Sequence, residues 1–208
     1  MTLTPQDVKV RPPAESILAG ALPPDLSIRR LTRQEYQRMR SVGILAEDNT
    51  TELVAGLLIT KMTKNRAHSR ANKRVRTWFE DAVPEGYSVD AQEPIVTEDS
   101  EPEPDVFILR GSDDDFLEEQ PPARAVALVV EIADATLRVD RTLKANVYAR
   151  AAVPVYWVVN LVERQIEVYT HPTLDAYAQR DIYGESDVIP LQLDGLVVAR
   201  TPVSNLLP

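Results

Sequence analysis

Two short apolar segments of this sequence each carry one acidic residue at a position where burial is expected. PEPDVFILR contains Asp105 near its start, and AVALVVEIAD contains Glu131 near its end. Both segments have the length and β-branched content of buried strands. An unpaired carboxylate in such a place costs several kcal/mol or takes up a proton, so it normally has a cation partner or a chemical role. Two such acids on separate strands indicate a metal site.

A lysine follows on the next predicted helix, DRTLKANVYARAAVP. Its apolar residues recur at spacings of three and four, and we expect Asp140 to cap its start and Pro154 to end it. Lys144 precedes Tyr148 by four residues and so lies on the same apolar face. The ammonium group of Lys144 is therefore predicted to point toward the sheet.

A third acid, Glu52, lies in TTELVAGLLITKM, a segment that predicts a hairpin of two short strands with a turn at Gly56. The groups that hydrolyse a phosphodiester are then all present, on Glu52, Asp105, Glu131 and Lys144. Carboxylates bind one or two Mg²⁺ ions, and the metal polarises the phosphate and activates a water. A lysine ammonium orients that water or stabilises the transition state.

Six short motifs follow one another along most of the chain. They are E-L-x-x-G at 52–56, S-E-P-E-P-D at 100–105, V-V-E at 129–131, T-L-R-x-D-R at 136–141, K-x-x-x-Y-A at 144–149 and V-P-x-Y-W-V-V at 153–159. In this order, over about Leu31 to about Leu196, they resemble the Uma-two family. Members of that family are predicted restriction endonucleases of the PD-(D/E)XK nuclease superfamily.

The resemblance implies an α/β (α+β) fold with a restriction-endonuclease-like core, in which helices flank a central mixed β-sheet and a β-rich part follows. It implies a divalent metal, Mg²⁺ with Mn²⁺ as a substitute, that binds at Asp105, Glu131 and Glu52. The superfamily lysine usually lies two residues after the second acid, where this chain has Ala133. The resemblance implies that Lys144 replaces it in the catalytic set, and that the protein forms a homodimer, as nucleases of this superfamily often do.

Simpler interpretations of the four residues stay open. Asp105 could be a solvated strand end, and Glu131 could face outward from an edge strand. Lys144 could extend its ammonium to solvent along its methylene stem. Strand alternation could equally place Glu52 on an exposed face. Taken together and in family order, the four residues favour a site.

Other functions also stay open. A nuclease fold that has lost its chemistry could serve as a binding module, in which case the four residues should be replaceable without effect. A competent site could act on RNA or on another phosphodiester instead of DNA. An aspartic-protease-like pair of carboxylates is a more distant alternative, because it would not need Lys144.

The distribution of charge bears on the substrate. The net charge of −9 argues against indiscriminate binding of nucleic acid. However, one stretch without any acid carries seven basic residues: Lys61, Lys64, Arg66, Arg70, Lys73, Arg74 and Arg76. Our hypothesis is that this segment receives the DNA backbone; a solvated helix face is an equal alternative. His68 could act there as a base or contact phosphate, although a lone histidine on a helix more often does neither.

The elements that must position these residues can be predicted in outline. Thr32 and Glu35 form a capping box for a helix that Gly43 closes, and a longer helix is expected from Asn65 to Val83. The acidic, proline-containing segment GSDDDFLEEQPPAR is predicted to be a loop. Strands are expected in YWVVN, RQIEVYT, AYAQRDIYG and around LDGLVVA.

Composition limits the remaining possibilities. A chain of 208 residues can bury one core, so we expect a single domain over 28–208 behind a proline-rich, partly flexible arm over 1–27. The absence of cysteine excludes disulfides, Cys-ligated zinc and a thiol nucleophile. No apolar stretch approaches membrane-spanning length and no signal peptide is visible, so a cytoplasmic enzyme is expected.

Overall fold

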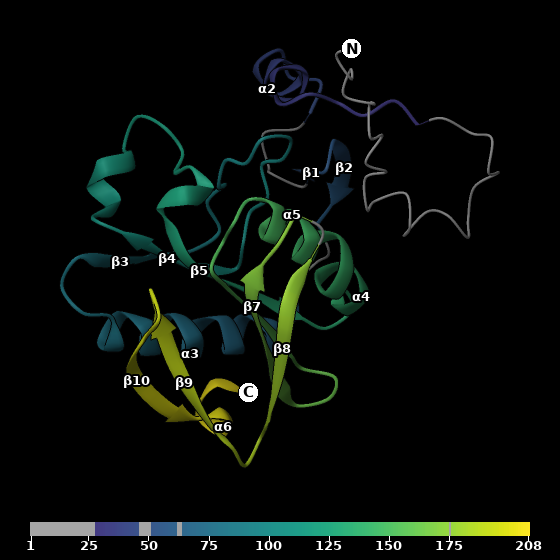
Figure 1. The fold of residues 1–208 in the computed structure, drawn as a ribbon. Helices are drawn as coiled ribbons and strands as arrows, with labels where there is room; N and C mark the ends of the chain where they lie inside the picture. Colours follow the sequence, from purple (N-terminus) through teal and green to yellow (C-terminus); the bar gives the residue numbers. More distant parts are fainter. Residues whose placement is uncertain (1–27, 46–50, 62–63, 175) are drawn as a thin grey trace, which may run out of the picture.

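A six-stranded mixed β-sheet forms the centre of the computed structural model, which describes residues 28–45, 51–61, 64–174 and 176–208 (Figure 1). The strands lie side by side in the order β3-β4-β5-β6-β7-β8. Their bounds are β3 Tyr87–Asp90, β4 Val106–Arg110, β5 Val126–Ala133, β6 Val155–Asn160, β7 Gln165–Pro172 and β8 Tyr177–Gly184. The predicted mixed sheet is confirmed, whereas the predicted arm over 1–27 lies outside the described residues.

The two central strands, β5 and β6, are the parallel pair of the sheet, and the other neighbours pair antiparallel. A parallel connection needs a crossover, which the helical segment between these strands provides. Every residue of β5 and β6 is buried. Their nearly continuous apolar sequences follow from this position, because both faces of the sheet are covered.

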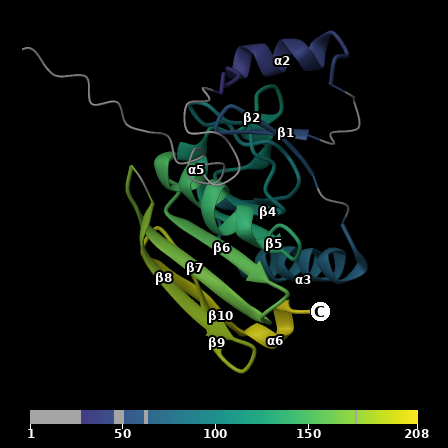
Figure 2. The same cartoon turned by 90° about the vertical axis from the view of Figure 1, so that its right-hand side faces the viewer.

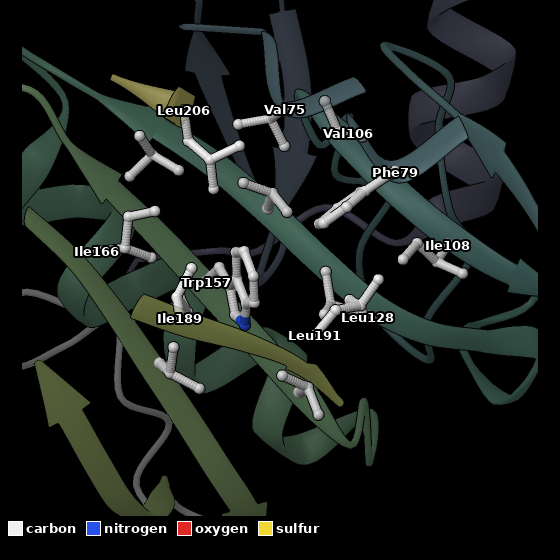
Figure 3. Close-up of a cluster of buried hydrophobic side chains, with 14 of the residues drawn as sticks. Val75, Phe79, Val106, Ile108, Leu128, Trp157, Ile166, Ile189, Leu191 and Leu206 are labelled. Atoms are coloured by element: carbon white, nitrogen blue, oxygen red, sulfur yellow. The ribbon is translucent and has the colours of Figure 1, made fainter. Parts of the chain in front are cut away.

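One face of the sheet packs against α3 (Arg66–Ala82), a hairpin of β9 (Val188–Leu193) and β10 (Leu196–Pro202), and the short α6 (Val203–Leu206). Figure 2 shows these elements on one side of the sheet and α5 on the other. Figure 3 shows side chains of α3, the sheet, β9 and α6 meeting in this core; those labelled include Val75, Phe79, Trp157, Ile166, Leu191 and Leu206. Because α3 is fixed in this way, its first turns have a defined position beside β4 and β5.

The opposite face is covered by the crossover helix, which has three consecutive parts: α4 (Leu137–Val139), a π-helical turn (Asp140–Lys144) and α5 (Ala145–Arg150). The prediction that Asp140 caps this helix was wrong, because the helix begins earlier and Asp140 lies buried inside it. A capping preference is local, and burial beside Lys144 overrides it here. Single π-helical turns occur frequently at functional sites.

The N-terminal part of the described chain forms a helix and a hairpin, and the hairpin packs on the crossover helix. The predicted capping box of Thr32 and Glu35 is confirmed in α2 (Arg33–Ser41), and the predicted hairpin is confirmed as β1 (Thr51–Val54) and β2 (Leu57–Thr60). A side chain at Gly56 would collide with Arg30, and its φ of +72° also favours glycine. Apolar side chains join the hairpin to the helix; among them are Val54, Ala55, Leu143 and Val147.

Two further comparisons with the sequence concern the edges of the fold. The edge strand β3 was not predicted, because its four residues do not form a clear apolar pattern. The acidic segment that follows β4 is mainly loop, with short 3-10 turns at Asp113–Phe116 and Ala123–Ala125. No helix in the described part of the chain is long and apolar enough to cross a membrane.

Candidate active site

The strand register places Asp105 beside Glu131. In the antiparallel pair of β4 and β5, Val106 is opposite Val130, and the two acids are the next residue along on each strand. The backbone N–H of Ile132 donates to Asp105 Oδ2 at 2.9 Å, which fixes this carboxylate against the end of β5. The two acids that the sequence marked as unusual therefore lie next to each other at one end of the β4–β5 pair.

Glu131 faces the crossover helix, where two donors converge on one of its oxygens. Lys144 Nζ donates to Glu131 Oε1 at 2.9 Å, and the Tyr148 hydroxyl donates to the same atom at 2.7 Å. Lys144 and Tyr148 are four residues apart and project from the same side of the helix. The prediction that Lys144 points toward the sheet is confirmed.

Glu52 reaches the same lysine from the hairpin. Its Oε1 lies 2.9 Å from Lys144 Nζ, and its Oε2 accepts the backbone N–H of Glu103 at 3.0 Å. The hairpin is joined to the segment before β4 by a bridge between Leu53 and Glu101. Three acids and one lysine from four separate segments of the chain thus line the same pocket.

The burial of these residues excludes their simpler interpretations. The side chain of Lys144 is only 9% exposed, so its ammonium does not extend into solvent. The side chains of Glu52 and Glu131 are 4% and 6% exposed, and that of Asp105 is 8% exposed. None of the three carboxylates is therefore a solvated strand end or an outward-facing side chain.

Asp105 has two basic side chains as partners of its own. Lys64 Nζ lies 3.0 Å from its Oδ1, and His68 Nε2 lies 3.1 Å from its Oδ2. Asn72 holds the backbone carbonyl of Asp105 at 3.0 Å from the next turn of α3. Burial raises the pKa of Asp105, but the hydrogen bond and charge of His68, the charge of Lys64 and the Ile132 N–H outweigh it and lower that pKa to about 2.

Asp140 is a fourth carboxylate in the same region. The Thr136 hydroxyl donates to its Oδ2 at 2.5 Å, and the Tyr156 hydroxyl donates to its backbone carbonyl at 3.1 Å. Burial raises the pKa of Asp140 to about 6, although the charge of Lys144 opposes this. Asp140 and Lys144 are four residues apart, so one helical face brings both to the pocket.

The protonation of the central pair follows from the same surroundings. Burial raises the pKa of Glu131, and the charge of Lys144 opposes this only in part because other acids lie near. Burial alone would lower the pKa of Lys144, but the charges of Glu131 and Glu52 raise it well above its ordinary value. Lys144 is therefore a protonated ammonium at neutral pH.

These residues line a pocket of about 310 Å³. Among the described residues that line it, six are acidic and three are lysines, so negative charge is in excess; the acids are Glu52, Glu103, Asp105, Glu131, Asp134 and Asp140. A larger hollow of about 1380 Å³ beside α2 contains none of the four predicted catalytic residues. The chemistry is therefore concentrated in the smaller pocket.

The donor set of this pocket fits a hard divalent cation, because Mg²⁺ and Mn²⁺ prefer carboxylate oxygens. As the side chains stand, no group of three or more acidic or histidine residues in the described chain is arranged to coordinate an ion. The carboxylate oxygens contact Lys144, Lys64 and His68 instead. A metal ion would have to displace some of these basic side chains.

The structure divides the basic segment into two groups. Lys61 and Lys64 line the pocket, whereas Arg66, Arg70 and Lys73 are exposed on α3. Arg74 donates to the backbone carbonyl of Leu207, and Arg76 pairs with Glu80. Only the first two of the seven basic residues are thus brought to the acidic site.

A buried acid elsewhere shows how this protein neutralises a structural carboxylate. Glu167 on β7 has no exposed side-chain surface, and it accepts hydrogen bonds from Arg141, Tyr169 and Asn160 and pairs with Arg180. Burial raises its pKa, but these donors outweigh burial and lower that pKa to about 2. Glu167 thus has arginine partners and a full set of donors outside the pocket.

Several residues of the site were missed or undervalued from the sequence. A lone helix histidine such as His68 is more often without a role, yet His68 contacts Asp105. Asp140, predicted to be a helix cap, lies inside the helix and lines the pocket. Glu103 was given no role, although it lines the pocket. Spacing is the available signal: His68 and Asn72 are four residues apart, as residues on one helix face are, and Glu103 and Asp105 are two apart. Neither spacing indicates that His68 lies beside Asp105, which requires the fold.

Comparisons with known proteins agree with this fold. The chain shares its fold with a crystal structure described as "a putative nuclease belonging to DUF820" from Anabaena variabilis, with a TM-score of 0.64 at 16% sequence identity; the match covers 85% of this chain and 97% of that one. No curated protein matches the chain. A family model described as "Putative restriction endonuclease" matches residues 33–200. The chain therefore belongs to the Uma2 family of restriction-endonuclease-like proteins.

Proposed function

We propose that the protein is a Mg²⁺-dependent endonuclease that hydrolyses phosphodiester bonds in DNA. The observation that carries this proposal is that Glu52 and Glu131 meet at Lys144 while Asp105 lines the same pocket, where negative charge is in excess. Buried acids that serve only structure need no such pocket, as Glu167 shows.

Each residue of the site has a distinct proposed role. Asp105 and Glu131 would hold the metal, and Glu52 would support the metal or its water. A bound divalent ion supplies charge that polarises the phosphate and acidifies a water. Lys144 donates hydrogen bonds and does not accept a proton, because its ammonium stays protonated between Glu52 and Glu131. It therefore orients the attacking water or balances negative charge on the phosphate.

The residues around Asp105 allow the exchange that metal binding requires. The side chain of Lys64 is 38% exposed, so it can leave Asp105 for solvent at little cost. His68 is more enclosed, with 13% of its side chain exposed. We therefore expect Lys64 to be the first partner that a metal ion displaces from Asp105.

The activity is tested by incubating the purified protein with supercoiled DNA in Mg²⁺ or Mn²⁺. Nicked or linear DNA should form only with the metal present, and an excess of EDTA should stop the reaction. Polarising a phosphate needs positive charge, which the metal supplies and the negatively charged carboxylates cannot. Removal of the metal is therefore expected to abolish cleavage. Gel electrophoresis over time measures the rate.

Single-stranded RNA and a small phosphodiester are tested in parallel, because the site itself does not distinguish them. Cleavage of RNA but not DNA would overturn the DNA part of the proposal and leave the reaction class intact. Cleavage of DNA that persists in EDTA would contradict the proposed metal chemistry.

One observation favours a second function, a nuclease fold that binds without cutting. Both oxygens of Asp105 are already in contact with protein side chains, Lys64 and His68. In that function the ion pairs are permanent, so neither metal binding nor cleavage would occur. Replacement of Asp105 would then leave nucleic-acid binding unchanged.

The proposed path of the DNA runs along α3. Arg66, Arg70 and Lys73 recur at intervals of four and three residues, so they form one exposed stripe on α3. The same helix contributes His68 and Asn72 to the site. We expect the stripe to contact the backbone of a duplex whose scissile phosphate lies in the pocket.

Replacement of Arg70 by glutamine tests this path. If Arg70 contacts one phosphate, the slope of log affinity against log salt concentration should fall by about one unit. Fluorescence anisotropy with a labelled duplex in EDTA measures binding without cleavage. Arg200→Gln is the matched control, since Arg200 is exposed on β10, away from the pocket lining. An equal effect of the two variants would rule out a specific role for the stripe.

A further inference from the structure

Glu103 is a buried carboxylate with only one of its two oxygens paired. Its side chain is 5% exposed, and Oε2 forms an ion pair with Lys61. Oε1 is shielded from solvent and has no hydrogen-bond partner among the described residues. Burial of a carboxylate oxygen without a hydrogen-bond donor or a cation is unfavourable. We therefore expect this atom to have a ligand.

The fold places Glu103 at the candidate active site. Glu103 and Asp105 are separated by Pro104 in the segment that leads into β4. Both side chains line the same pocket. The backbone N–H of Glu103 also holds Glu52 Oε2 at 3.0 Å, which puts Glu103 next to a second acid of the site.

The kind of ligand follows from the charges nearby. Glu103 faces a pocket whose described lining holds more acids than lysines, so an anion is disfavoured there. A neutral donor would leave the excess negative charge in place. A hard divalent cation would both coordinate the carboxylate oxygen and reduce the excess negative charge of the pocket.

We propose that Glu103 is a further ligand of the divalent cation in this pocket, and that Lys61 competes with the cation for it. This inference rests on the metal dependence proposed above and adds a residue to the metal-binding set. Lys61 holds the carboxylate in the metal-free protein, much as Lys64 holds Asp105. Each of these surface lysines then shields one acid until the cation binds.

The test is isothermal titration of the full chain with Mn²⁺ in the absence of substrate. Glu103→Gln should weaken binding about tenfold or more, because a ligand oxygen becomes a neutral amide. Lys61→Met should tighten binding by up to about fivefold, because the competing ammonium is removed. Opposite changes from the two partners of one ion pair are not expected if that pair serves stability alone.

Two controls distinguish the loss of a metal ligand from the loss of one negative charge. Asp134→Asn removes the same charge from the wall of the same pocket, at a residue that Asn65 already holds. An effect of Glu103→Gln no larger than that of Asp134→Asn would overturn the inference. In the double variant, the tightening from Lys61→Met should disappear, because Lys61 acts through Glu103; tightening that persists would also overturn it.

The outcome also separates this inference from the function on which it rests. If wild-type protein binds no Mn²⁺, the metal dependence and the inference fail together. If wild type binds Mn²⁺ and Asp105→Asn abolishes binding while Glu103→Gln matches the control, only the inference fails. Thermal unfolding of each variant without metal verifies that it is folded, and the double variant leaves no unpaired lysine or glutamate at this ion pair.

Discussion

Replacement of Lys144 by methionine is expected to destabilise the protein by about 3–5 kcal/mol, as measured by urea unfolding at neutral pH. Breaking a buried ion pair by removing one partner has this cost because the other charge stays buried without compensation. Here Lys144 compensates two acids, since Glu52 and Glu131 both contact its Nζ at 2.9 Å. A loss of this size is a large part of the stability of an ordinary domain.

Two further variants test whether the destabilisation comes from the loss of the Lys144 charge. Lys144→Met combined with Glu131→Gln should recover part of the loss, because one of the uncompensated charges is removed as well. Lys73→Met, on the exposed side of α3, should change stability by less than about 0.5 kcal/mol. If Lys144→Met behaved like Lys73→Met, the ammonium would not be the charge that holds the acids together.

Replacement of Asp105 by asparagine should reduce metal-dependent DNA cleavage by at least about a hundredfold. Mutation of a residue that only contacts a metal ligand typically lowers metal affinity or activity by about 10- to 100-fold. Asp105 is proposed to bind the metal directly, so its loss should cost at least as much. Asparagine keeps an acceptor for the Ile132 N–H and preserves the approximate shape. The loss should therefore come from chemistry and not from misfolding.

The control for Asp105→Asn is Asp134→Asn, which removes one acid from the same pocket wall. Since the pKa of Asp105 is lowered to about 2, its charge contributes stability above the ordinary pKa of an aspartate, and this contribution is lost as the pH falls through about 2. Asparagine lacks this contribution at neutral pH, so cleavage is compared at a temperature where circular dichroism finds both variants folded. Equal cleavage by the two variants would remove Asp105 from the catalytic set.

Much of this arrangement could be predicted from the sequence. Apolar runs such as AVALVVEIAD predict buried strands, and a single acid inside such a run is conspicuous because it breaks the pattern. The position of Lys144 on an apolar helix face predicts its direction. These signals are local, and the structure brings their residues together as expected.

Other parts of the site depend on contacts between distant segments. His68 and Asp105 are separated by 37 residues, and nothing in the sequence around either residue indicates the other. Asp140 has the residue type and position of a helix cap, and only the tertiary structure shows that it is buried beside Lys144. The role of Lys61 and Lys64 as partners of acids also requires the fold, because surface lysines usually remain solvated.

The central claim is that this pocket binds a divalent metal, and thermal unfolding during a titration with Mn²⁺ and Mg²⁺ tests it most directly. Binding to the folded state alone should stabilise wild type by about 2.7 kcal/mol at a hundredfold excess over the dissociation constant. We predict a metal-dependent rise in unfolding temperature for wild type that Asp105→Asn and Glu131→Gln lose. Millimolar metal that leaves wild type unchanged, or that stabilises all three proteins equally, would contradict the claim and favour a binding module without metal chemistry.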